Sequence, residues 1–237
     1  MGFDFHTAWE TFYRRFVMQG GYKSVLSGLS VTVQIALFGL MIGIVIGTVI
    51  AVIKVMPKYK LWPRILEKIA DVYVGFFRGT PLMVQLLIGW FGICSTFNLP
   101  ITRMTAAILI YGMNSGAYVA EIMRSGIQAV DPGQLEASRA LGLSYPVSML
   151  KVVIPQAIKN ILPTLGNEFI ALIKDTSVVS FIAIVDLTKS FREIGDSSYE
   201  YIIPYLMLAA IYLILVGVIA LGVKLMERGL RKNERTR

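Results

Sequence analysis

The sequence predicts an all-α integral membrane protein with five transmembrane helices and one helical loop in the cytoplasm. Of its 237 residues, 55% are hydrophobic and 16% are charged, and the mean hydropathy of +0.65 lies above the range of soluble globular proteins. A helix needs ~20 mostly apolar residues to cross the hydrocarbon core. Four stretches carry no charged residue and a fifth is long and apolar despite Glu168, Lys174 and Asp175: 24–53, 79–102, 104–120, 201–223 and 158–185.

The N-terminal segment, residues 1–25, alternates aromatic and charged side chains and is expected to lie as an amphipathic helix at the outer membrane interface. Asp4 and Glu10 interrupt it, so it lacks the apolar core of a cleavable signal. The sequence has one cysteine, Cys94, and one histidine, His6. These are too few for an internal disulfide or for a metal site built from cysteine or histidine. No catalytic residues, no metal site and no enzymatic activity are predicted.

Lysine and arginine fall unequally on the two sides of the five predicted spans. Fifteen lie in the loops 54–68 and 124–159 and in the tail from 224, and six lie on the other side: Arg14, Arg15, Lys23, Arg103, Lys189 and Arg192. The positive-inside rule then places the N-terminus outside and the C-terminus in the cytoplasm. This bias, with attraction to anionic lipid, accounts for the net charge of +8, so no nucleic-acid partner is expected.

The first two spans contain features of helix packing and of helix breaking. Gly39, Gly43 and Gly47 recur every four residues, which lets another helix approach closely. The charged segment 62–71 is expected to lie along the cytoplasmic interface. In the run 78–81, Arg78-Gly79-Thr80-Pro81, glycine and proline break the helix, as they do at transporter sites and gates. Alternatively, Arg78 only reaches the cytoplasmic surface while Pro81 opens a helix.

The third span carries a polar stripe, because Asn114 and Glu121 are seven residues apart on one helix face, with Tyr118 between them. Such a stripe faces the helix bundle or a cavity. Glu121 is expected to pair with Arg124, three residues on. Asn114 lies deeper and is the candidate for lining a translocation path.

The fourth span has its polar residues on one face, since Thr164, Glu168 and Asp175 are spaced by four and seven. Charges in the middle of a bilayer cost ~2.5–3.5 kcal/mol each and persist when paired, hydrated or functional. Glu168 could therefore offer a carboxylate to the ammonium group of a ligand. Alternatively, Lys174 forms an ion pair with Glu168 or Asp175 that only orients helices, and residues 174–177 interrupt the helix.

A phosphate-binding loop of the pattern G-x-x-x-x-G-K-[ST] is absent from the sequence, so any ATP hydrolysis belongs to another polypeptide. The loop between the third and fourth spans has the pattern of a helix–turn–helix. Asp131 fits the N-cap and Pro132 the first turn, with Gln134 in the capping-box position. Gly142 ends the first helix, and a second begins in the run Ser144-Tyr145-Pro146.

This loop resembles the EAA motif of binding-protein-dependent ATP-binding cassette (ABC) importer permeases, which reads EAA, three residues, G, nine residues, I-x-LP. The motif positions in this chain are Glu136, Ala137, Ser138, Gly142, Val152, Ile154 and Pro155. Ser138, Val152 and Ile154 depart from the pattern conservatively. Residues 78–85 and 167–177 are also similar to the polar amino acid subgroup, the histidine, glutamine and arginine type of permease.

The resemblance covers about residues 26–227 and implies the architecture of a type I ABC importer permease. It implies a five-helix domain over 26–227, a coupling loop at about 125–156 and a basic cytoplasmic tail at 228–237. It also implies a bacterial inner-membrane location and four partners: a dimer of ATPase subunits that binds the ATP and magnesium, a second permease subunit, identical or paralogous, an extracytoplasmic solute-binding protein, and the amino acid substrate. No cofactor is then expected in this chain.

The expected function is therefore alternating access to an amino acid path, with the loop seated in a groove of the ATPase. The expected path residues are Arg78, Thr80, Asn114, Asn167, Glu168, Asp175 and Ser177, and the coupling residues are Glu136, Ala137, Ser138, Gly142 and Pro155. The intramembrane carboxylates Glu168 and Asp175 slightly favour a cationic amino acid as the substrate. Two other classes remain open: a self-sufficient transporter or channel driven by an ion gradient, and a membrane anchor without a path.

Overall fold

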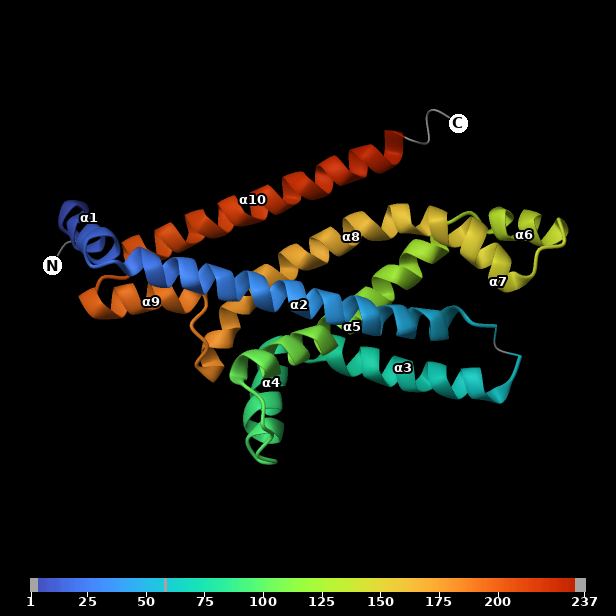
Figure 1. Cartoon of the computed structure of the whole chain (residues 1–237), viewed down its shortest axis with the longest axis horizontal. Coiled ribbons are helices and arrows are strands. Elements are labelled where there is room, and N and C mark those ends of the chain that lie inside the picture. The colour runs from blue at the N-terminus through green and yellow to red at the C-terminus, as the bar shows by residue number, and fades with distance from the viewer. Residues whose placement is uncertain (1–3, 58, 233–237) are drawn as a thin grey trace. The chain divides into compact units, whose positions relative to one another are not determined.

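The computed structural model describes residues 4–57 and 59–232, and every regular element in these ranges is a helix (Figure 1). The last five residues of the predicted basic tail, 233–237, and residues 1–3 of the N-terminal segment lie outside the described part. The four longest helices in these ranges are α2 (Gly21–Val55), α5 (Arg103–Gln128), α8 (Ile154–Asp175) and α10 (Ile202–Lys232). Each contributes residues to both of the compact units into which the chain divides.

Unit 1 comprises residues 1–39, 82–111 and 171–218. Besides its parts of the long helices, it contains six short elements: α1 (Phe5–Tyr13), η1 (Arg14–Met18), α4 (Leu82–Leu87), η2 (Ile88–Cys94), η4 (Thr176–Ile182) and α9 (Leu187–Ser198). Here η1 and η2 are π-helical and η4 is a 3₁₀ helix. The change from α8 to η4 at Thr176 confirms the interruption predicted at residues 174–177.

The N-terminal aromatic segment packs on α9 within this unit. Asp4 caps α1 through the backbone N–H of His6, and Phe12 and Phe191 are buried in one cluster with residues of α10. The ring of Phe16 stacks on Phe191 at 6.3 Å between centroids. The opposite side of α1 stays exposed, with Trp9 at its centre. The amphipathic pattern thus has a protein partner for its buried face, and its place at the outer interface stays a prediction.

Unit 2 comprises residues 40–81, 112–170 and 219–237. Its own elements are α3 (Leu61–Gly79), α6 (Pro132–Ala140), α7 (Tyr145–Ser148) and the π-helical η3 (Met149–Val153). A Cβ atom on Gly43 would meet Ser115 of α5 at 2.7 Å, and one on Gly47 would meet Val119 at 2.6 Å. The close helix packing predicted for these two glycines is therefore confirmed.

Helix breaks and caps follow the local sequence closely. The helix α3 ends at Gly79 and α4 begins after Pro81, as predicted. Asp131 accepts a hydrogen bond from Gly133 N and so caps α6, which confirms the predicted N-cap. The Gln134 side chain does not close a capping box: its Oε1 accepts a hydrogen bond from Gln156 Nε2 at 3.2 Å.

The lengths of the helices bear only in part on the predicted number of membrane spans. Within residues 4–57 and 59–232, two helices are long and apolar enough to cross a membrane, α2 and α10. They become three if α3 and the pair α4–η2 count as one broken span. The charge-free stretch 79–102 contains only the six-residue α4 and seven-residue η2, too short to cross alone. Five spans stay a prediction.

Candidate functional site

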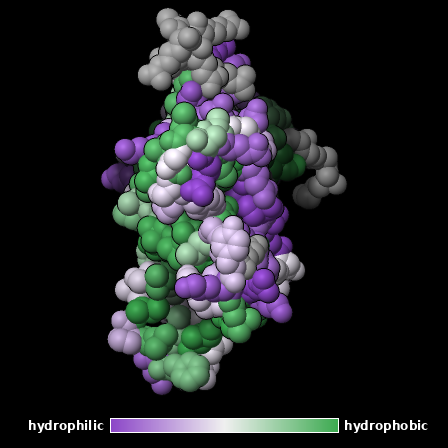
Figure 2. Space-filling view, turned by 90° about the vertical axis from the view of Figure 1, so that its right-hand side faces the viewer, coloured by the Kyte–Doolittle hydropathy of each residue, from purple (hydrophilic) through white to green (hydrophobic). Residues whose placement is uncertain are grey.

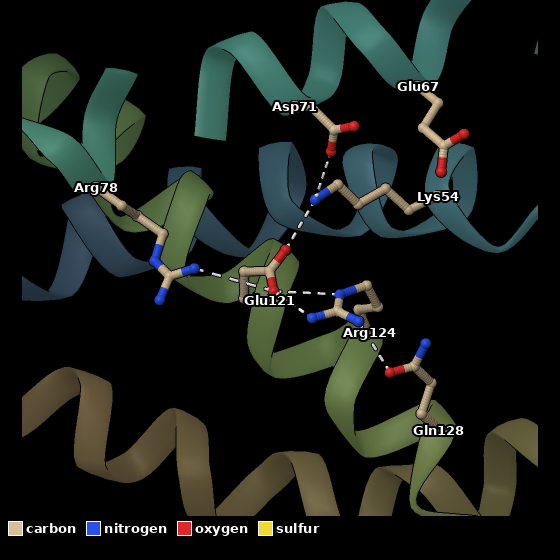
Figure 3. A pocket seen from close by; sticks show the side chains of 7 residues that line it. All are labelled: Lys54, Glu67, Asp71, Arg78, Glu121, Arg124 and Gln128. Atoms are coloured by element: carbon tan, nitrogen blue, oxygen red, sulfur yellow. Dashed lines mark hydrogen bonds and ion pairs between the residues drawn. The ribbon is translucent and has the colours of Figure 1, made fainter. Parts of the chain in front are cut away.

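A pocket of about 420 Å³ in unit 2 is lined almost entirely by charged side chains (Figure 3). Three helices contribute to it. The helix α2 provides Lys54, α3 provides Glu67, Asp71 and Arg78, and α5 provides Glu121, Arg124 and Gln128. Three cations and three carboxylates thus face a single opening.

Glu121 is the centre of this ion-pair network. Its Oε1 accepts a hydrogen bond from Lys54 Nζ at 2.8 Å, and its Oε2 accepts two from Arg124, at 2.6 Å from Nη2 and 3.1 Å from Nε. The predicted Glu121–Arg124 pair is therefore confirmed. Arg78 Nη1 lies 3.9 Å from the same carboxylate, beyond hydrogen-bond distance. The side chains of Lys54 and Glu121 are only 11% and 18% exposed, so this pair is largely removed from water.

Lys54 also bonds Asp71 at 3.0 Å, and its ammonium therefore connects α3 to α5 (Figure 3). The guanidinium of Arg78 lies over the ring of Tyr118 at 5.5 Å, a cation–π contact that orients it. Three helices are consequently held together by charges that line the pocket.

A second polar layer lies earlier on α5 in the same unit. Ser115 Oγ donates a hydrogen bond to Glu168 Oε1 at 3.0 Å, and Asn114 Nδ2 donates one to the Phe77 carbonyl at 3.2 Å. Thr80 Oγ1 donates to the Phe76 carbonyl at 2.8 Å. Of the predicted path residues in unit 2, Asn114 thus contacts α3 and Glu168 contacts α5.

The other predicted path residues are distributed as follows. Arg78 lies in the charged pocket, and Asn167 is exposed on α8. Asp175 and Ser177 belong to unit 1, where the Asp175 carbonyl accepts a hydrogen bond from Tyr111 Oη at 2.6 Å. The predicted path residues are thus divided between the two units.

The loop α6–α7 presents the motif residues in two ways. Glu136 and Ala137 are exposed on α6, whereas Ser138 is buried and its Oγ donates to the Leu135 carbonyl at 2.8 Å. The buried hydroxyl thus finds its hydrogen-bond partner within its own helix. Figure 2 views the side on which α6 and α7 lie in Figure 1 and shows hydrophilic side chains gathered there beside apolar ones.

The turn that follows α6 depends on Gly142, whose φ of +85° lies in the left-handed region that favours glycine. Arg139 Nη1 donates to the Leu143 carbonyl at 2.9 Å and closes the turn. The Leu141 side chain is 84% exposed at the tip. Pro155 is the second residue of α8 and directly follows the π-helical η3, within one continuous helical segment.

The loop is anchored to the helices beneath it. Tyr145 Oη donates a hydrogen bond to the Val55 carbonyl at the end of α2, at 3.0 Å. Burial raises the pKa of the Tyr145 hydroxyl, which keeps its proton available for this bond. Val130, Met149 and Val153 are buried together under the loop. The loop is therefore packed against α2, α5 and α8.

Sequence reasoning missed Lys54, Asp71 and Ser115 as members of these polar layers. The sequence does contain one pattern that could have pointed to the pocket, which is the position of charges at the ends of apolar stretches. Lys54 is the first charge after the stretch 24–53, and Glu121 is the first after 104–120. Arg78, likewise, is the last charge before 79–102. Charges that bound apolar stretches of neighbouring helices meet at one level, which is why these residues find one another.

Among the residues that the structure describes, no group of three or more histidine, cysteine, aspartate or glutamate side chains is placed to hold a metal ion. The polar sites in this part of the chain are instead ion pairs and hydrogen bonds.

Comparison with known proteins identifies the class. The profile of the family described as "Binding-protein-dependent transport system inner membrane component" matches residues 39–232. The chain therefore belongs to this family and is the helical membrane permease subunit of an ABC transport system. The fold is that of type I ABC permeases.

Individual relatives cover nearly the whole chain. It is 37% identical over 211 residues to the arginine transport system permease protein ArtQ of Bacillus subtilis, which covers 89% of this chain and 94% of that protein. It is also 37% identical over 206 residues to a putative glutamine transport system permease protein GlnP of Rickettsia bellii, covering 87% and 92%.

Two solved structures are similar. One, titled as an amino acid ABC transporter with histidines, is 39% identical, with a TM-score of 0.83 over 96% of this chain and 99% of that chain. An inward-facing MetNI methionine ABC transporter chain is 21% identical, with a TM-score of 0.67 over 88% and 95%, a likeness in fold alone.

Proposed function

We propose that this chain is the transmembrane permease subunit of an ATP-driven amino acid importer. The observation that carries the proposal is the anchored α6–α7 loop, which exposes Glu136, Ala137 and Leu141 around the turn at Gly142. A chain without a phosphate-binding loop needs such a surface to receive work from a separate ATPase. The relatives named for arginine and glutamine transport support amino acids as the substrate class.

In this proposal the loop seats in a groove of a dimeric ATPase partner, which binds the ATP and magnesium. Glu136 offers a carboxylate to a basic residue of that partner. The tight turn at Gly142 sets the shape of the docking surface, and Ser138 and Pro155 hold it in place. Because Tyr145 ties the loop to α2, a displacement of the loop is passed on to the helices.

The proposed topology has five spans in a bacterial inner membrane, with the N-terminus outside and the C-terminus in the cytoplasm. The excess of basic residues in the loops 54–68 and 124–159 supports this orientation. The chain then pairs with a second permease subunit, identical or paralogous, and receives its substrate from an extracytoplasmic solute-binding protein.

The proposed substrate contact in unit 2 is the layer of Asn114 and Glu168. The Glu168 carboxylate, oriented by Ser115, is able to bind the ammonium group of an amino acid. Asn114 and Thr80 offer polar groups, and Thr80 directly precedes the helix break at Pro81. Asp175 and Ser177 of unit 1 stay candidates for the same path.

The test is uptake of radiolabelled amino acids by proteoliposomes that contain the full complex with its ATPase and binding protein. We expect uptake to require ATP and to be abolished by Gly142→Leu, while membrane insertion is unchanged. The matched control is Gly229→Leu, since Gly229 lies in α10 and a Cβ added there would meet no atom within 4 Å. Uptake driven by an ion gradient without the ATPase would reject the proposal and identify a secondary transporter.

A further inference from the structure

The segment η4 (Thr176–Ile182) in unit 1 continues α8 as a 3₁₀ helix of seven residues. Runs of 3₁₀ helix longer than three or four residues are uncommon, because their hydrogen bonds are poorly aligned, and a long run often marks a hinge or a strained sequence. The segment contains Ser177 and follows Asp175, both of which are candidates for the proposed path. Its geometry therefore bears on how that path changes.

The burial pattern of η4 explains why it is a 3₁₀ helix in this structure. Thr176, Val179 and Ile182 are spaced by three residues, and each is at most 1% exposed. Three residues per turn place them in one row, whereas an α-helix would displace each by about 60° around the axis from the one before. Because η4 contacts α4 and α9, the packing of this unit favours the 3₁₀ form.

The end of η4 is a strained turn. Ala183, the residue that follows it, has a φ of +60°, in the left-handed region that a residue with a Cβ atom adopts only at a cost. Its backbone N–H donates to the Ser180 carbonyl at 3.0 Å and closes the last turn. The Ala183 side chain is exposed, so packing does not require alanine at this position. Such a conformation persists only where its surroundings hold it.

The helix α9, three residues further on, provides this restraint because its start is seated on α2. Leu187 N donates a hydrogen bond to Thr32 Oγ1 at 3.2 Å, and both residues are fully buried. A Cβ atom on Gly28 would lie 2.5 Å from the Asp186 carbonyl oxygen, so the two backbones are in close contact. The chain after η4 is therefore fixed to α2.

The chain before η4 is held as well, since Tyr111 Oη donates to the Asp175 carbonyl at 2.6 Å. Seven residues extend about 14 Å as a 3₁₀ helix and about 10.5 Å as an α-helix. A change between the two forms would thus alter the length of η4 by about 3.5 Å. With α9 fixed to α2, the change is passed to Asp175 and Ser177.

We propose that η4 is a strap of variable length, which alternates between the 3₁₀ form of this structure and an α-helical form, with Ala183 as its hinge. In the α-helical form Ala183 leaves the left-handed region and continues the helix. The inference rests on the proposed function and deepens it, because it names the element that moves Asp175 and Ser177 during transport.

Substitutions of Ala183 should shift the two forms in opposite directions. Glycine adopts the left-handed region without cost and weakens an α-helix, so Ala183→Gly is expected to favour the 3₁₀ form about tenfold. Valine is β-branched and rarely adopts that region, so Ala183→Val is expected to favour the α-helical form about threefold.

The experiment measures the length of the strap by electron–electron double resonance between two spin labels. The labels are attached through Lys174→Cys and Val185→Cys, at exposed positions on either side of η4, in a Cys94→Ser background of the full complex in nanodiscs. We expect two distances that differ by about 3.5 Å, with populations that change between the ATP-free and the vanadate-trapped complex. Ala183→Gly should enrich the longer distance and Ala183→Val the shorter one.

Transport provides a second measurement, with a matched control. Because Ala183→Gly holds the strap in one form, we expect ATP-driven amino acid uptake to fall about tenfold. The control is Tyr199→Gly, since Tyr199 is 89% exposed at the end of α9 and also has a left-handed φ, of +54°. This variant should leave the two distances and uptake unchanged. The thermal midpoint of each variant reports whether the complex is folded.

A single distance in both states of the wild-type complex overturns the inference. So does a folded Ala183→Gly variant with wild-type populations, or a loss of uptake in Tyr199→Gly as large as that in Ala183→Gly. Failure of the proposed function looks different, because then the wild-type complex takes up no amino acid with ATP. ATP-driven uptake together with a single, constant distance rejects only the inference.

Discussion

The α6–α7 loop and the charged pocket belong to the same unit but arise in different ways. The loop is made by neighbours in sequence: Asp131 caps α6 two residues before Gly133, and Gly142 turns the chain two residues after α6 ends. The pocket joins residues far apart, since Lys54 and Glu121 are separated by 67 positions. The shape of a loop can therefore be set locally, whereas an ion-pair network depends on how helices pack.

Of the variants that test this difference, removal of the Glu121 carboxylate should have the largest effect on stability. Glu121→Gln leaves Lys54 and Arg124 with weakened partners in a largely buried site, so we expect the free energy of unfolding to fall by about 3 kcal/mol. Thermal unfolding in detergent measures the change. Glu193→Gln, on the exposed face of α9, is the control and should be nearly neutral. Equal midpoints for the two variants would mean that the network does not hold the helices together.

The packing of α2 against α5 brings the charges together, and substitutions of two glycines test it. Gly47→Ala places a methyl group 2.6 Å from Val119, and we expect a destabilisation of about 2 kcal/mol from overpacking. Gly75→Ala lies in α3 with open space around its Cβ and should stabilise by roughly 0.5–1 kcal/mol through helix propensity. A thermal midpoint of Gly47→Ala that stays the same or rises would contradict the close approach of α2 and α5.

The anchor of the loop is tested by Tyr145→Phe, which removes only the hydroxyl that bonds the Val55 carbonyl. We expect a loss of about 1 kcal/mol in stability and fewer amino acids transported for each ATP hydrolysed. The ratio of uptake to hydrolysis in proteoliposomes measures the coupling. Tyr199→Phe, at an exposed tyrosine of the other unit, is the control. An unchanged ratio would show that this bond does not contribute to coupling.

The smallest effect on stability is expected at the rim of the pocket. The Asp71 side chain is 58% exposed, and Lys54 keeps its bond to Glu121 when Asp71 is changed. Asp71→Asn should therefore lower the free energy of unfolding by less than about 0.5 kcal/mol, as for other exposed ion pairs. A loss as large as that of Glu121→Gln would place Asp71 in the core of the network.

The outcome of the sequence predictions follows the same division. Interactions within a few residues are predictable, such as the Asp131 cap, the turn at Gly142 and the Glu121–Arg124 pair, because their geometry is fixed by helix spacing. Gln134 is the exception, since its side chain bonds Gln156 of the neighbouring helix in place of its own helix end. Lys54, Asp71 and Ser115 could not be assigned partners, because no local rule states which faces of two helices meet.

The sequence by itself determined the helical membrane class, the helix break at Gly79 and Pro81, the cap at Asp131 and the turn at Gly142. These depend on apolar composition, on φ preferences and on hydrogen bonds within one turn, all of which are local. Only the tertiary structure decided that charges at the ends of three apolar stretches meet around Glu121 and that Glu168 faces Ser115. Burial makes such pairs selective, because a charge taken out of water is stable only where the packing supplies its partner.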